Sequence, residues 1–310
     1  MEPDINNKVI TKIIDGLMPF LHGKRDAIIK ILTCVFSGGH VLIEDMPGVG
    51  KTTVAVAAAR ALGFSFGRVQ CTNDLLPSDI TGLNIFKPEK SEFEFRPGPI
   101  FNNLVLLDEI NRATPKTQSA LLEAMGEGQA TIDGETRKMP DPFIAIATQN
   151  PTEHAGTFPL PESQMDRFMM RVSMGYPNRA AEMEILGLGS QRRQVDELRP
   201  IMSAAEVASI RRILDKEIKV SEKITGYILN IAERTRTHSL IAAGVSTRGA
   251  MILMNCARRV AWMRGRAFVV PEDVKLFANA VLAHRIQMKG GAAAEAADVM
   301  DEILRDTPAL

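Results

Sequence analysis

The chain has 310 residues, and its 37 lysines and arginines are balanced by 37 aspartates and glutamates. This length allows roughly two domains, and a net charge of zero argues against a strong overall attraction to nucleic acid or to an anionic membrane. Cys34, Cys71 and Cys256 are scattered, which predicts neither a disulfide framework nor a metal site and suits a reducing cytoplasm. Because no apolar run is long enough to cross a bilayer, we expect no membrane insertion.

The first forty residues predict two helices. Apolar residues recur with helical spacing over residues 5–20, where Ile5, Val9 and Ile13 fall on one face. Residues 24–36 predict a second helix, which a pair of glycines ends. We therefore expect a helical segment ahead of the first strand.

A Gly-rich turn follows the next predicted element, a strand at residues 41–44. The turn reads Glu44-Asp45-Met46-Pro47-Gly48-Val49-Gly50-Lys51-Thr52-Thr53 and leads into a helical pattern over residues 52–62. Backbone N–H groups of such a turn converge with the helix N-terminus on a point that suits a phosphate chain. Lys51 would reach the β- and γ-phosphates, and the Thr52 hydroxyl would hold Mg²⁺. The first glycine of the GxxxxGK[ST] pattern is Asp45 here, so this segment alone also fits an ordinary turn before a core helix.

Two carboxylates follow another predicted strand. The apolar run at residues 104–107 predicts a strand buried on both faces of a parallel sheet, and Asp108 and Glu109 come directly after it. Ligands of open α/β sheets bind at the carboxyl ends of the strands. Asp108 is therefore expected to bind Mg²⁺ through water, and Glu109 to act as a general base for water. Alone, the run also fits a strand that ends in solvated acids; together with the Gly-rich turn it favours a nucleotide site.

A third strand is predicted at residues 143–148, and Asn150 follows it. Asn150 is placed to hydrogen-bond the attacking water or the γ-phosphate, although Asn-Pro alone is an ordinary turn signal. The remaining predicted strands and helices alternate, which implies a parallel sheet covered by helices on both faces. They are strands at residues 66–71 and 169–173 and helices at 76–81 and 115–127.

Two β-hairpins interrupt this alternation. The first spans residues 83–96 with a turn at 87–90, and the second spans residues 129–138 with Asp133-Gly134 at its turn. Both are charged insertions that a nucleotide-binding core does not require, and solvated decoration is an equal alternative.

The chain becomes almost entirely helical in pattern after Tyr176-Pro177-Asn178. We therefore predict an α/β domain over residues 1–176 and a smaller helical domain over residues 177–310. The predicted helices lie at residues 179–186, 204–213, 221–235, 246–263 and 271–284, with a further terminal helix between 292 and 310.

These motifs, in this order, resemble the MoxR family of AAA+ ATPases over residues 9–285. The resemblance implies a P-loop NTPase core of the α/β class, followed by an all-α lid, with ATP and Mg²⁺ as cofactors. Asp45 is usual in MoxR-like sequences, and the two hairpins match inserts that line the central pore in one AAA+ clade. The matching segments are residues 44–52, Asp74-Leu75-Leu76-Pro77-Ser78-Asp79-Ile80-Thr81-Gly82, Phe95-Arg96-Pro97-Gly98-Pro99-Ile100-Phe101, Asp108-Glu109-Ile110-Asn111-Arg112-Ala113 and Ala147-Thr148-Gln149-Asn150-Pro151.

The resemblance also implies a role for each motif residue. Lys51 and Thr52 are the Walker A contacts to phosphate and metal. Asp108 and Glu109 are the Walker B metal contact and catalytic base, and Asn150 is sensor 1. The other phosphate-loop residues expected around the nucleotide are Pro47, Gly48, Val49, Gly50 and Thr53.

Three further positions match parts of the family's nucleotide site. Arg167 matches the arginine finger supplied to a neighbouring subunit, with Arg171 as a nearby competitor. Arg248 matches sensor 2, which touches the γ-phosphate from the lid. Gly23 lies where the family's adenine-contacting turn sits, although Lys24 departs from the usual Gln there.

The function implied is an ATP-hydrolysing motor that remodels or matures other proteins. The resemblance implies a homo-oligomeric ring, expected to be a hexamer, often working with a von Willebrand factor A-domain partner. Alternatives are a magnesium-chelatase-like motor subunit, a nucleic-acid-associated AAA+ NTPase and a nucleotide-gated scaffold without activity. The form of the loop at residues 45–47 favours MoxR, the low aromatic content of 5% argues against stacking on nucleic-acid strands, and the presence of Glu109 and Asn150 argues against a pure binder.

Overall fold

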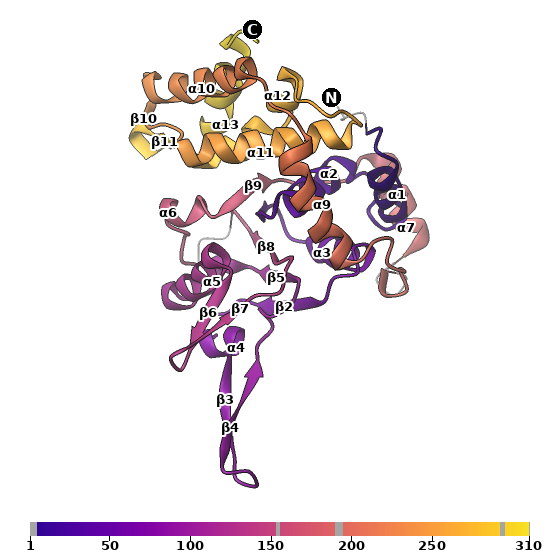
Figure 1. Cartoon of the computed structure of the whole chain (residues 1–310), viewed down its shortest axis with the longest axis vertical. Coiled ribbons are helices and arrows are strands. Elements are labelled where there is room, and N and C mark those ends of the chain that lie inside the picture. Colours follow the sequence, from indigo (N-terminus) through magenta and orange to yellow (C-terminus); the bar gives the residue numbers. More distant parts are fainter. Residues whose placement is uncertain (1–4, 153–155, 190–194, 292–294, 310) are drawn as a thin grey trace.

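The computed structural model describes residues 5–152, 156–189, 195–291 and 295–309. A sheet flanked by helices forms the middle of the molecule, a helical layer with the C-terminus lies at one end, and a long hairpin projects from the other (Figure 1). A search of the described residues for a helix of membrane-spanning length and apolarity found none.

The central sheet consists of five parallel strands in the order β2–β5–β8–β1–β9. Every residue of β5 before its last is buried, as a strand with both faces covered requires. The predicted parallel sheet with helices on both faces is therefore confirmed. The strand bounds are β1 (His40–Glu44), β2 (Phe66–Gln70), β5 (Leu104–Asp108), β8 (Ile144–Gln149) and β9 (Phe168–Val172).

Alternate residues of the strands enter two different cores, because successive side chains of a strand point to opposite faces of the sheet. On β1, Val41 and Ile43 join one core, and Leu42 between them joins the other. This alternation explains why a strand made of a continuous apolar run contributes to the cores on both faces of the sheet. The helices that contribute are α1 (Lys8–Leu17), α2 (Arg25–Ser37) and α3 (Lys51–Ala61) to the first core and α5 (Pro115–Glu127) to the second.

The first helix begins later than its apolar pattern indicates. The side-chain oxygen of Asn7 accepts hydrogen bonds from the N–H groups of Val9 and Ile10, so the helix starts at Lys8. Its buried face includes Ile10 and Ile13, whereas Val9 is 41% exposed. The prediction that Val9 shares one face with Ile13 is wrong, because the helix buries the face that carries Ile10 and Ile13 and leaves Val9 exposed.

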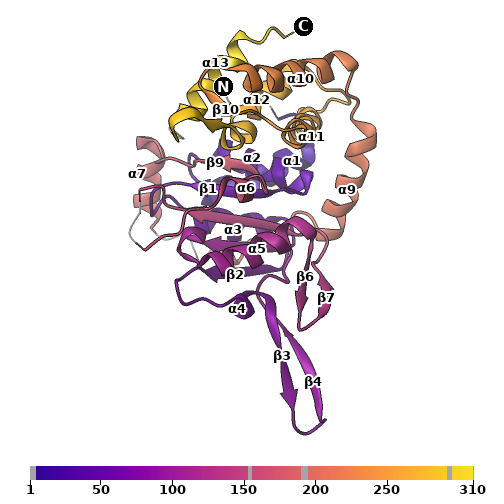
Figure 2. The ribbon, with the colours of Figure 1, turned by 90° about the vertical axis from the view of Figure 1, so that its left-hand side faces the viewer.

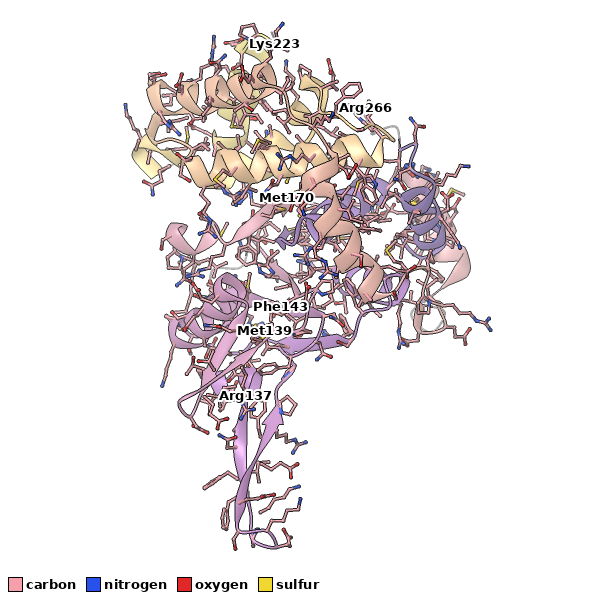
Figure 3. The ribbon with its side chains drawn as sticks, viewed as in Figure 1. Arg137, Met139, Phe143, Met170, Lys223 and Arg266 are labelled. Carbon is pink, nitrogen blue, oxygen red and sulfur yellow. The ribbon has the colours of Figure 1, made fainter. Side chains whose placement is uncertain are left out.

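Both predicted hairpins are confirmed, and the second contacts the first near the base of the first. Asn84 donates a hydrogen bond of 2.8 Å to Asp133, and the guanidinium of Arg137 lies 4.0 Å from the centroid of the Phe95 ring. Figure 3 shows Arg137 beside the base of the long hairpin, which then extends away from the body (Figure 2). The hairpins are β3 (Gly82–Lys87) with β4 (Glu92–Pro97), preceded by α4 (Pro77–Thr81), and β6 (Gln129–Ile132) with β7 (Glu135–Lys138).

The last part of the chain is mostly helical, as predicted. Ser203, Ser221 and Ser246 each cap the N-terminus of a helix by accepting a backbone hydrogen bond. A short antiparallel pair, β10 (Ile241–Ala243) with β11 (Gln287–Met288), was not predicted. The helices are α6 (Glu162–Met165), α7 (Arg179–Leu188), α9 (Ala204–Glu217), α10 (Glu222–Thr237), α11 (Thr247–Met263), α12 (Pro271–Leu282) and α13 (Ala296–Asp306), with 3₁₀ turns η1 (Met18–Phe20), η2 (Ile110–Arg112), η3 (Ala283–Arg285) and η4 (Lys289–Gly291).

The helical layer is fixed to α2 and to the start of β9. Phe36 and Trp262 pack edge to face with ring centroids 4.9 Å apart, and Arg259 donates to the carbonyl of Phe36 at 3.2 Å. Arg285 donates to the carboxylate of Asp166 at 2.8 Å. One apolar core continues from α1 and α2 into α11 and α12, so the division into residues 1–176 and 177–310 stays a prediction.

Candidate active site

The loop between β1 and α3 presents backbone N–H groups at a helix N-terminus. Gly48 and Gly50 have φ angles of +84° and +91°, and α3 begins directly after Gly50. An added Cβ at either position would meet nothing within 4 Å. The backbone conformation itself, rather than crowding, therefore favours glycine here. The result is a ready-made anion site at the carboxyl end of β1.

Lys51 projects its ammonium into this loop. Its Nζ donates to the backbone carbonyls of Asp45 at 2.6 Å and Gln149 at 3.3 Å. Burial lowers the pKa of Lys51, while the negative charges of Asp45, Asp108 and Glu109 oppose that shift. Both of these direct partners are neutral carbonyls, so the positive charge stays available to a phosphate.

Asp108 ends β5 beside this loop and is 14% exposed. One carboxylate oxygen accepts from the hydroxyl of Thr148 at 2.7 Å, and the other accepts from the guanidinium of Arg68 at 2.8 Å. Asp108 thus lies at the predicted edge of the sheet, with one oxygen held by a neighbouring strand. The Arg68 contact would compete with a metal ion for the second oxygen.

Glu109 adopts a backbone conformation that is uncommon for residues other than glycine. Its φ and ψ are 56° and 53°, in the left-handed region. Such a conformation costs about 1–3 kcal/mol and persists only when surrounding contacts impose it. The Glu109 N–H donates to the Thr148 hydroxyl at 2.9 Å, and its carboxylate accepts from Arg112 at 3.2 Å and Gln70 at 3.4 Å. Strain of this kind is characteristic of functional positions.

Thr148 holds both acids and was not identified from the sequence as a site residue. It is fully buried on β8, and its hydroxyl donates to Asp108 while accepting from the N–H of Glu109. One hydroxyl group therefore fixes the metal-binding candidate and the base candidate relative to each other. A threonine at the end of an otherwise apolar strand was the signal that could have revealed it.

Asn150 follows β8 at the same edge. The parallel pairing of Glu44 with Gln149 brings the end of β8 beside the start of the phosphate loop. The side-chain oxygen of Asn150 accepts from the N–H and the hydroxyl of Thr152, at 3.2 and 2.9 Å. These contacts orient the amide and leave its nitrogen as the group that can donate to water or phosphate.

A cavity of about 270 Å³ lies beside the glycines of the loop. Its walls include Leu21, His22, Lys24, Met174 and Pro177. This volume is at the small end for ligand pockets and suits a nucleobase.

The turn around the predicted Gly23 forms part of this cavity. Gly23 itself has a φ of +70°, and an added Cβ would lie 3.4 Å from the Cβ of Ala181 on α7. The ring of His22 is 2.7 Å from the carboxylate of Glu184, also on α7. Gly23 therefore lets the turn approach α7, while His22 and Lys24 line the cavity.

Arg167 lies at the opposite edge of the sheet from Lys51. Phe168, the first residue of β9, pairs with His40, the first residue of β1, whereas the phosphate loop follows the last residue of β1. A strand of this length spans about 13 Å. The Arg167 side chain lies against α5, where an added Cβ on Gly126 would be 1.7 Å from its guanidinium. Arg167 is therefore remote from the phosphate loop of its own chain.

Arg248 lies at the amino edge with Arg167. Its guanidinium is 3.5 Å from the carboxylate of Asp166, and its side chain is 64% exposed. The structure therefore does not bring Arg248 to the phosphate loop of its own chain. The competitor Arg171 instead forms an ion pair of 3.3 Å with Glu44 on β1, which engages it within the chain.

Comparison with known proteins agrees with this geometry. Residues 40–170 match the family model described as "ATPase family associated with various cellular activities (AAA)", and residues 233–306 match an AAA lid domain. The chain is 38% identical to Chaperone MoxR1 of Mycobacterium tuberculosis over 88% of this chain and 74% of that protein. The chain belongs to the MoxR family of AAA+ ATPases. This membership confirms the family predicted from the motifs.

Two further relatives of this MoxR-family chain extend over nearly its full length. It is 43% identical to the uncharacterized protein YeaC of Bacillus subtilis over 90% of this chain and 87% of that one. The crystal structure of a candidate ATPase from Cytophaga hutchinsonii superposes with a TM-score of 0.88, at 37% identity, covering 97% of this chain and 95% of that one. Both the AAA core and the lid are thus shared with these proteins.

The donors available for a metal in this MoxR-family site are oxygen atoms. The Thr52 hydroxyl and the Asp108 carboxylate are the ligand types that Mg²⁺ prefers, with water and phosphate completing its coordination. Among the residues that the structure describes, no three His, Cys, Asp or Glu side chains form a metal-binding cluster. The residues therefore fit a metal that arrives with a nucleotide better than a permanently held ion.

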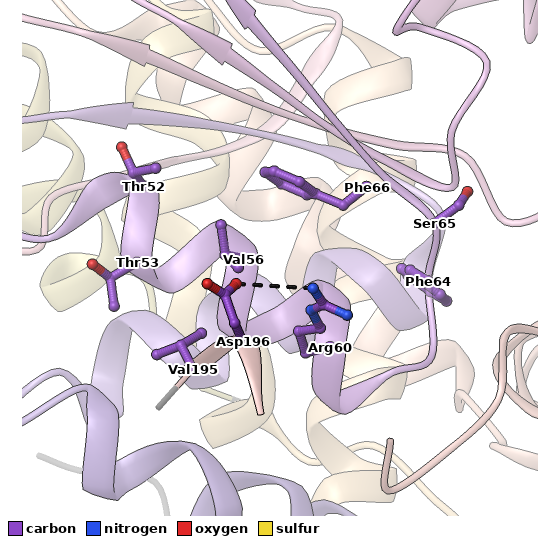
Figure 4. A pocket seen from close by; sticks show the side chains of 9 residues that line it. All are labelled: Thr52, Thr53, Val56, Arg60, Phe64, Ser65, Phe66, Val195 and Asp196. Atoms are coloured by element: carbon purple, nitrogen blue, oxygen red, sulfur yellow. Dashed lines mark ion pairs between the residues drawn. The ribbon is translucent and has the colours of Figure 1, made fainter. Parts of the chain in front are cut away.

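A second cavity, of about 440 Å³, lies between α3, residues 64–66 at the start of β2, and residues 195–196 (Figure 4). Thr52 and Thr53 line it at the start of the helix, and Arg60, 3.8 Å from Asp196, lines it further along. Thr53 also lines the cavity suited to a base. The first turn of α3 in this MoxR-family chain therefore has a cavity on more than one side.

Proposed function

We propose that this chain is a Mg²⁺-dependent ATPase whose active site is completed between two copies of the chain. One observation carries the proposal. Lys51, Asp108 and Glu109 gather at the carboxyl edge of the sheet, whereas Arg167 and Arg248 lie at its amino edge. The two arginines can meet a triphosphate only in a neighbouring copy.

Within one copy, the carboxyl edge would bind ATP and prepare water. The N–H groups after Gly48 and the ammonium of Lys51 would hold the phosphates. Thr52 and Asp108 would hold Mg²⁺, which neutralises charge on the phosphate oxygens. Asp108 would then exchange its contact with Arg68 for the metal.

Glu109 and Asn150 would act on the water molecule. Glu109 would take its proton, which requires the carboxylate to leave Arg112 and Gln70 for the water. The amide nitrogen of Asn150 would orient the same water or the γ-phosphate. Phosphoryl transfer depends chiefly on such positioning and on charge stabilisation.

The neighbouring copy would supply the remaining positive charge. Arg167 is the finger candidate, because Arg171 is engaged by Glu44 in its own chain. Arg248, exposed beside Asp166, would reach the same γ-phosphate. In other NTPases an arginine finger contributes roughly 10³–10⁵ in rate. An isolated copy would therefore hydrolyse ATP slowly.

The output we propose is remodelling or maturation of partner proteins by a homo-oligomeric ring, expected to be a hexamer. The similarity to a protein named Chaperone MoxR1 supports this activity. A von Willebrand factor A-domain protein is the partner expected from the family. The exposed side chains of Phe86 and Phe93 on the long hairpin offer an apolar contact for such a partner or client.

Mixing two inactive variants tests the shared site. Glu109→Gln should bind ATP without hydrolysing it, and Arg167→Ala should bind ATP with near-normal affinity but lose hydrolysis. Mixed rings contain interfaces with an intact base on one side and an intact finger on the other, so phosphate release should partly recover. Arg248→Ala should be complemented by Glu109→Gln in the same way.

The control is Arg212→Ala, which removes an exposed arginine from α9 and should leave turnover unchanged. Formation of mixed rings is verified by differently tagged copies. Absence of recovery in verified mixed rings would contradict a finger supplied by a neighbour. Ordinary turnover by Glu109→Gln would remove Glu109 as the base.

A further inference from the structure

Asp45, which replaces the first glycine of the standard phosphate-loop pattern, makes an unusual set of contacts. One oxygen of its carboxylate accepts from the hydroxyl of Ser173 at 3.1 Å, from the N–H of Gly175 at 2.7 Å and from the N–H of Met174. The other oxygen accepts from the N–H of Met46 at 3.2 Å. Three of these four donors lie about 130 residues away along the chain, so the carboxylate joins two distant segments.

The backbone of Asp45 reaches the phosphate site at the same time. Its N–H donates to the carbonyl of Gln149 at 3.2 Å, and its carbonyl accepts from the ammonium of Lys51 at 2.6 Å. One residue therefore contacts the phosphate-binding lysine through its main chain and residues 173–175 through its side chain.

Residues 173–175 connect β9 to α7 and form part of the base cavity, because Met174 lines it. Lys24 also holds this segment, through different atoms. The buried ammonium of Lys24 donates to the carbonyl of Met174 at 3.1 Å and to that of Gly175. Asp45 thus accepts from the N–H groups of Met174 and Gly175, and Lys24 donates to the carbonyls of the same two residues.

The charges of the two residues suit this arrangement. Burial opposes ionisation of Asp45, but the hydrogen bonds from Gly175, Met174, Ser173 and Met46 outweigh it and lower the pKa of that carboxyl. Burial lowers the pKa of Lys24, and the negative charge of Asp45 opposes that shift. A carboxylate and an ammonium therefore hold one short segment between them.

We propose that Asp45 is a positioning residue that couples the phosphate loop to the wall of the base cavity. Occupation of the loop by phosphates then keeps Met174 and its neighbours in place to receive the base, and Lys24 completes the coupling through its bonds to the carbonyls. This inference rests on the proposed ATPase function. Loss of the coupling weakens the contribution of the base to affinity and leaves the contribution of the phosphates intact.

The test compares Mg²⁺–ATP with Mg²⁺–tripolyphosphate, which lacks base and ribose, by titration calorimetry on the full chain. Asp45→Asn keeps the shape of the side chain but offers an amide nitrogen where N–H donors point. We expect affinity for ATP to fall about tenfold, the effect of roughly one lost charge-assisted hydrogen bond. Affinity for tripolyphosphate should change less than about twofold.

Two further variants address the same coupling. Asp45→Gly restores the standard loop pattern and should also weaken ATP selectively. Lys24→Met removes the contact with the carbonyls and should give the same selective loss, so the inference does not depend on the folding of one variant. The matched control is Asp26→Asn, which removes a carboxylate paired with Lys30 on α2 and should change neither affinity.

The outcomes separate the inference from the function on which it rests. Native protein that binds neither compound would overturn the proposed ATPase and this inference with it. Native binding with equal losses of ATP and tripolyphosphate in Asp45→Asn or Asp45→Gly would overturn only the coupling, because Asp45 would then shape the loop alone. Unchanged affinities in these variants and in Lys24→Met would overturn it as well.

Discussion

The two edges of the central sheet carry polar residues of different character. At the carboxyl edge, Lys51 donates to two backbone carbonyls, and Glu109 has a left-handed backbone conformation. At the amino edge, the side chains of Arg285 and His40 are buried and hydrogen-bonded within the chain, and Arg248 lies exposed beside Asp166. The carboxyl edge therefore carries the residues proposed to bind a ligand, and the amino edge exposes the charged side chain of Arg248.

The difference between the two edges separates the arginines from the phosphate loop of the same copy. Arg167 and Arg248 lie the length of a strand, about 13 Å, from the phosphate loop, and their side chains contact α5 and Asp166 instead. The lid packs at the amino edge through Arg285 and Asp166, so its Arg248 follows that edge. In the ring proposed above, movement of the lid would therefore move Arg248 relative to the adjacent copy.

Replacement of Arg167 or Arg171, the two candidate arginine fingers, should give the largest effect and tests the difference between the two edges. Arg167→Ala should lower kcat about 10³-fold, because the charge developing on the transferred phosphoryl group loses its partner. Arg171→Ala, the matched control, should lower kcat less than about tenfold, since Arg171 pairs with Glu44 in its own chain. Steady-state phosphate release by the assembled protein measures both. A larger loss in Arg171→Ala would reverse the assignment.

Acid unfolding tests whether the buried imidazole of His40, at the amino edge, stabilises the folded chain. The Nδ1 atom of His40 accepts from the N–H of Ala145 at 2.9 Å, and its Nε2 lies 3.0 Å from the carbonyl of Met125, so the ring is held neutral. Burial lowers the pKa of His40 from 6.5 to about 4. The unfolded chain binds a proton at higher pH than the folded chain, so stability falls as pH drops below the unfolded value. This loss amounts to about 2 kcal/mol at pH 5.

Urea unfolding at pH about 7.5 and about 5 measures this loss. His40→Leu should be less stable at the higher pH but should lack this part of the pH dependence. The native chain is compared with His40→Leu because burial also lowers the pKa of His284. That second shift likewise makes the folded chain less stable as the pH falls. Equal pH dependence in the native chain and in His40→Leu would contradict a structural role for the buried imidazole.

The carboxyl edge can be examined more finely through Thr148. Thr148→Val removes the hydroxyl that joins Asp108 to the N–H of Glu109, and we expect kcat to fall about tenfold and the Mg²⁺ requirement to rise. Thr148→Ser keeps the hydroxyl and should restore most activity. Turnover measured across Mg²⁺ concentrations distinguishes this from a general loss of stability. Equal defects in both variants would show that packing, not the hydroxyl, matters.

Much of the secondary structure was predictable because its signals are local. The strand at residues 104–108 and the hairpin at residues 129–138 agree with the observed elements, since apolar runs and an Asp-Gly turn act over a few neighbouring residues. Parallel strands then bring the residues after each strand to one edge, which places Asp108 and Asn150 near the phosphate loop. Their roles in catalysis stay predictions.

The contacts that cross the fold could not be predicted in this way. The position of Arg248 depends on how the lid packs on Asp166, and the donors to Asp45 come from residues 173–175. The short pair β10–β11 also forms between distant segments that are too short to carry a pattern. The sequence by itself determined the elements and the order of the motifs, because these follow from neighbours along the chain. Only the tertiary structure decided where the lid places Arg248 and what holds Asp45. Those contacts join residues that lie about eighty positions apart for Arg248 and Asp166, and about 130 apart for Asp45 and its donors.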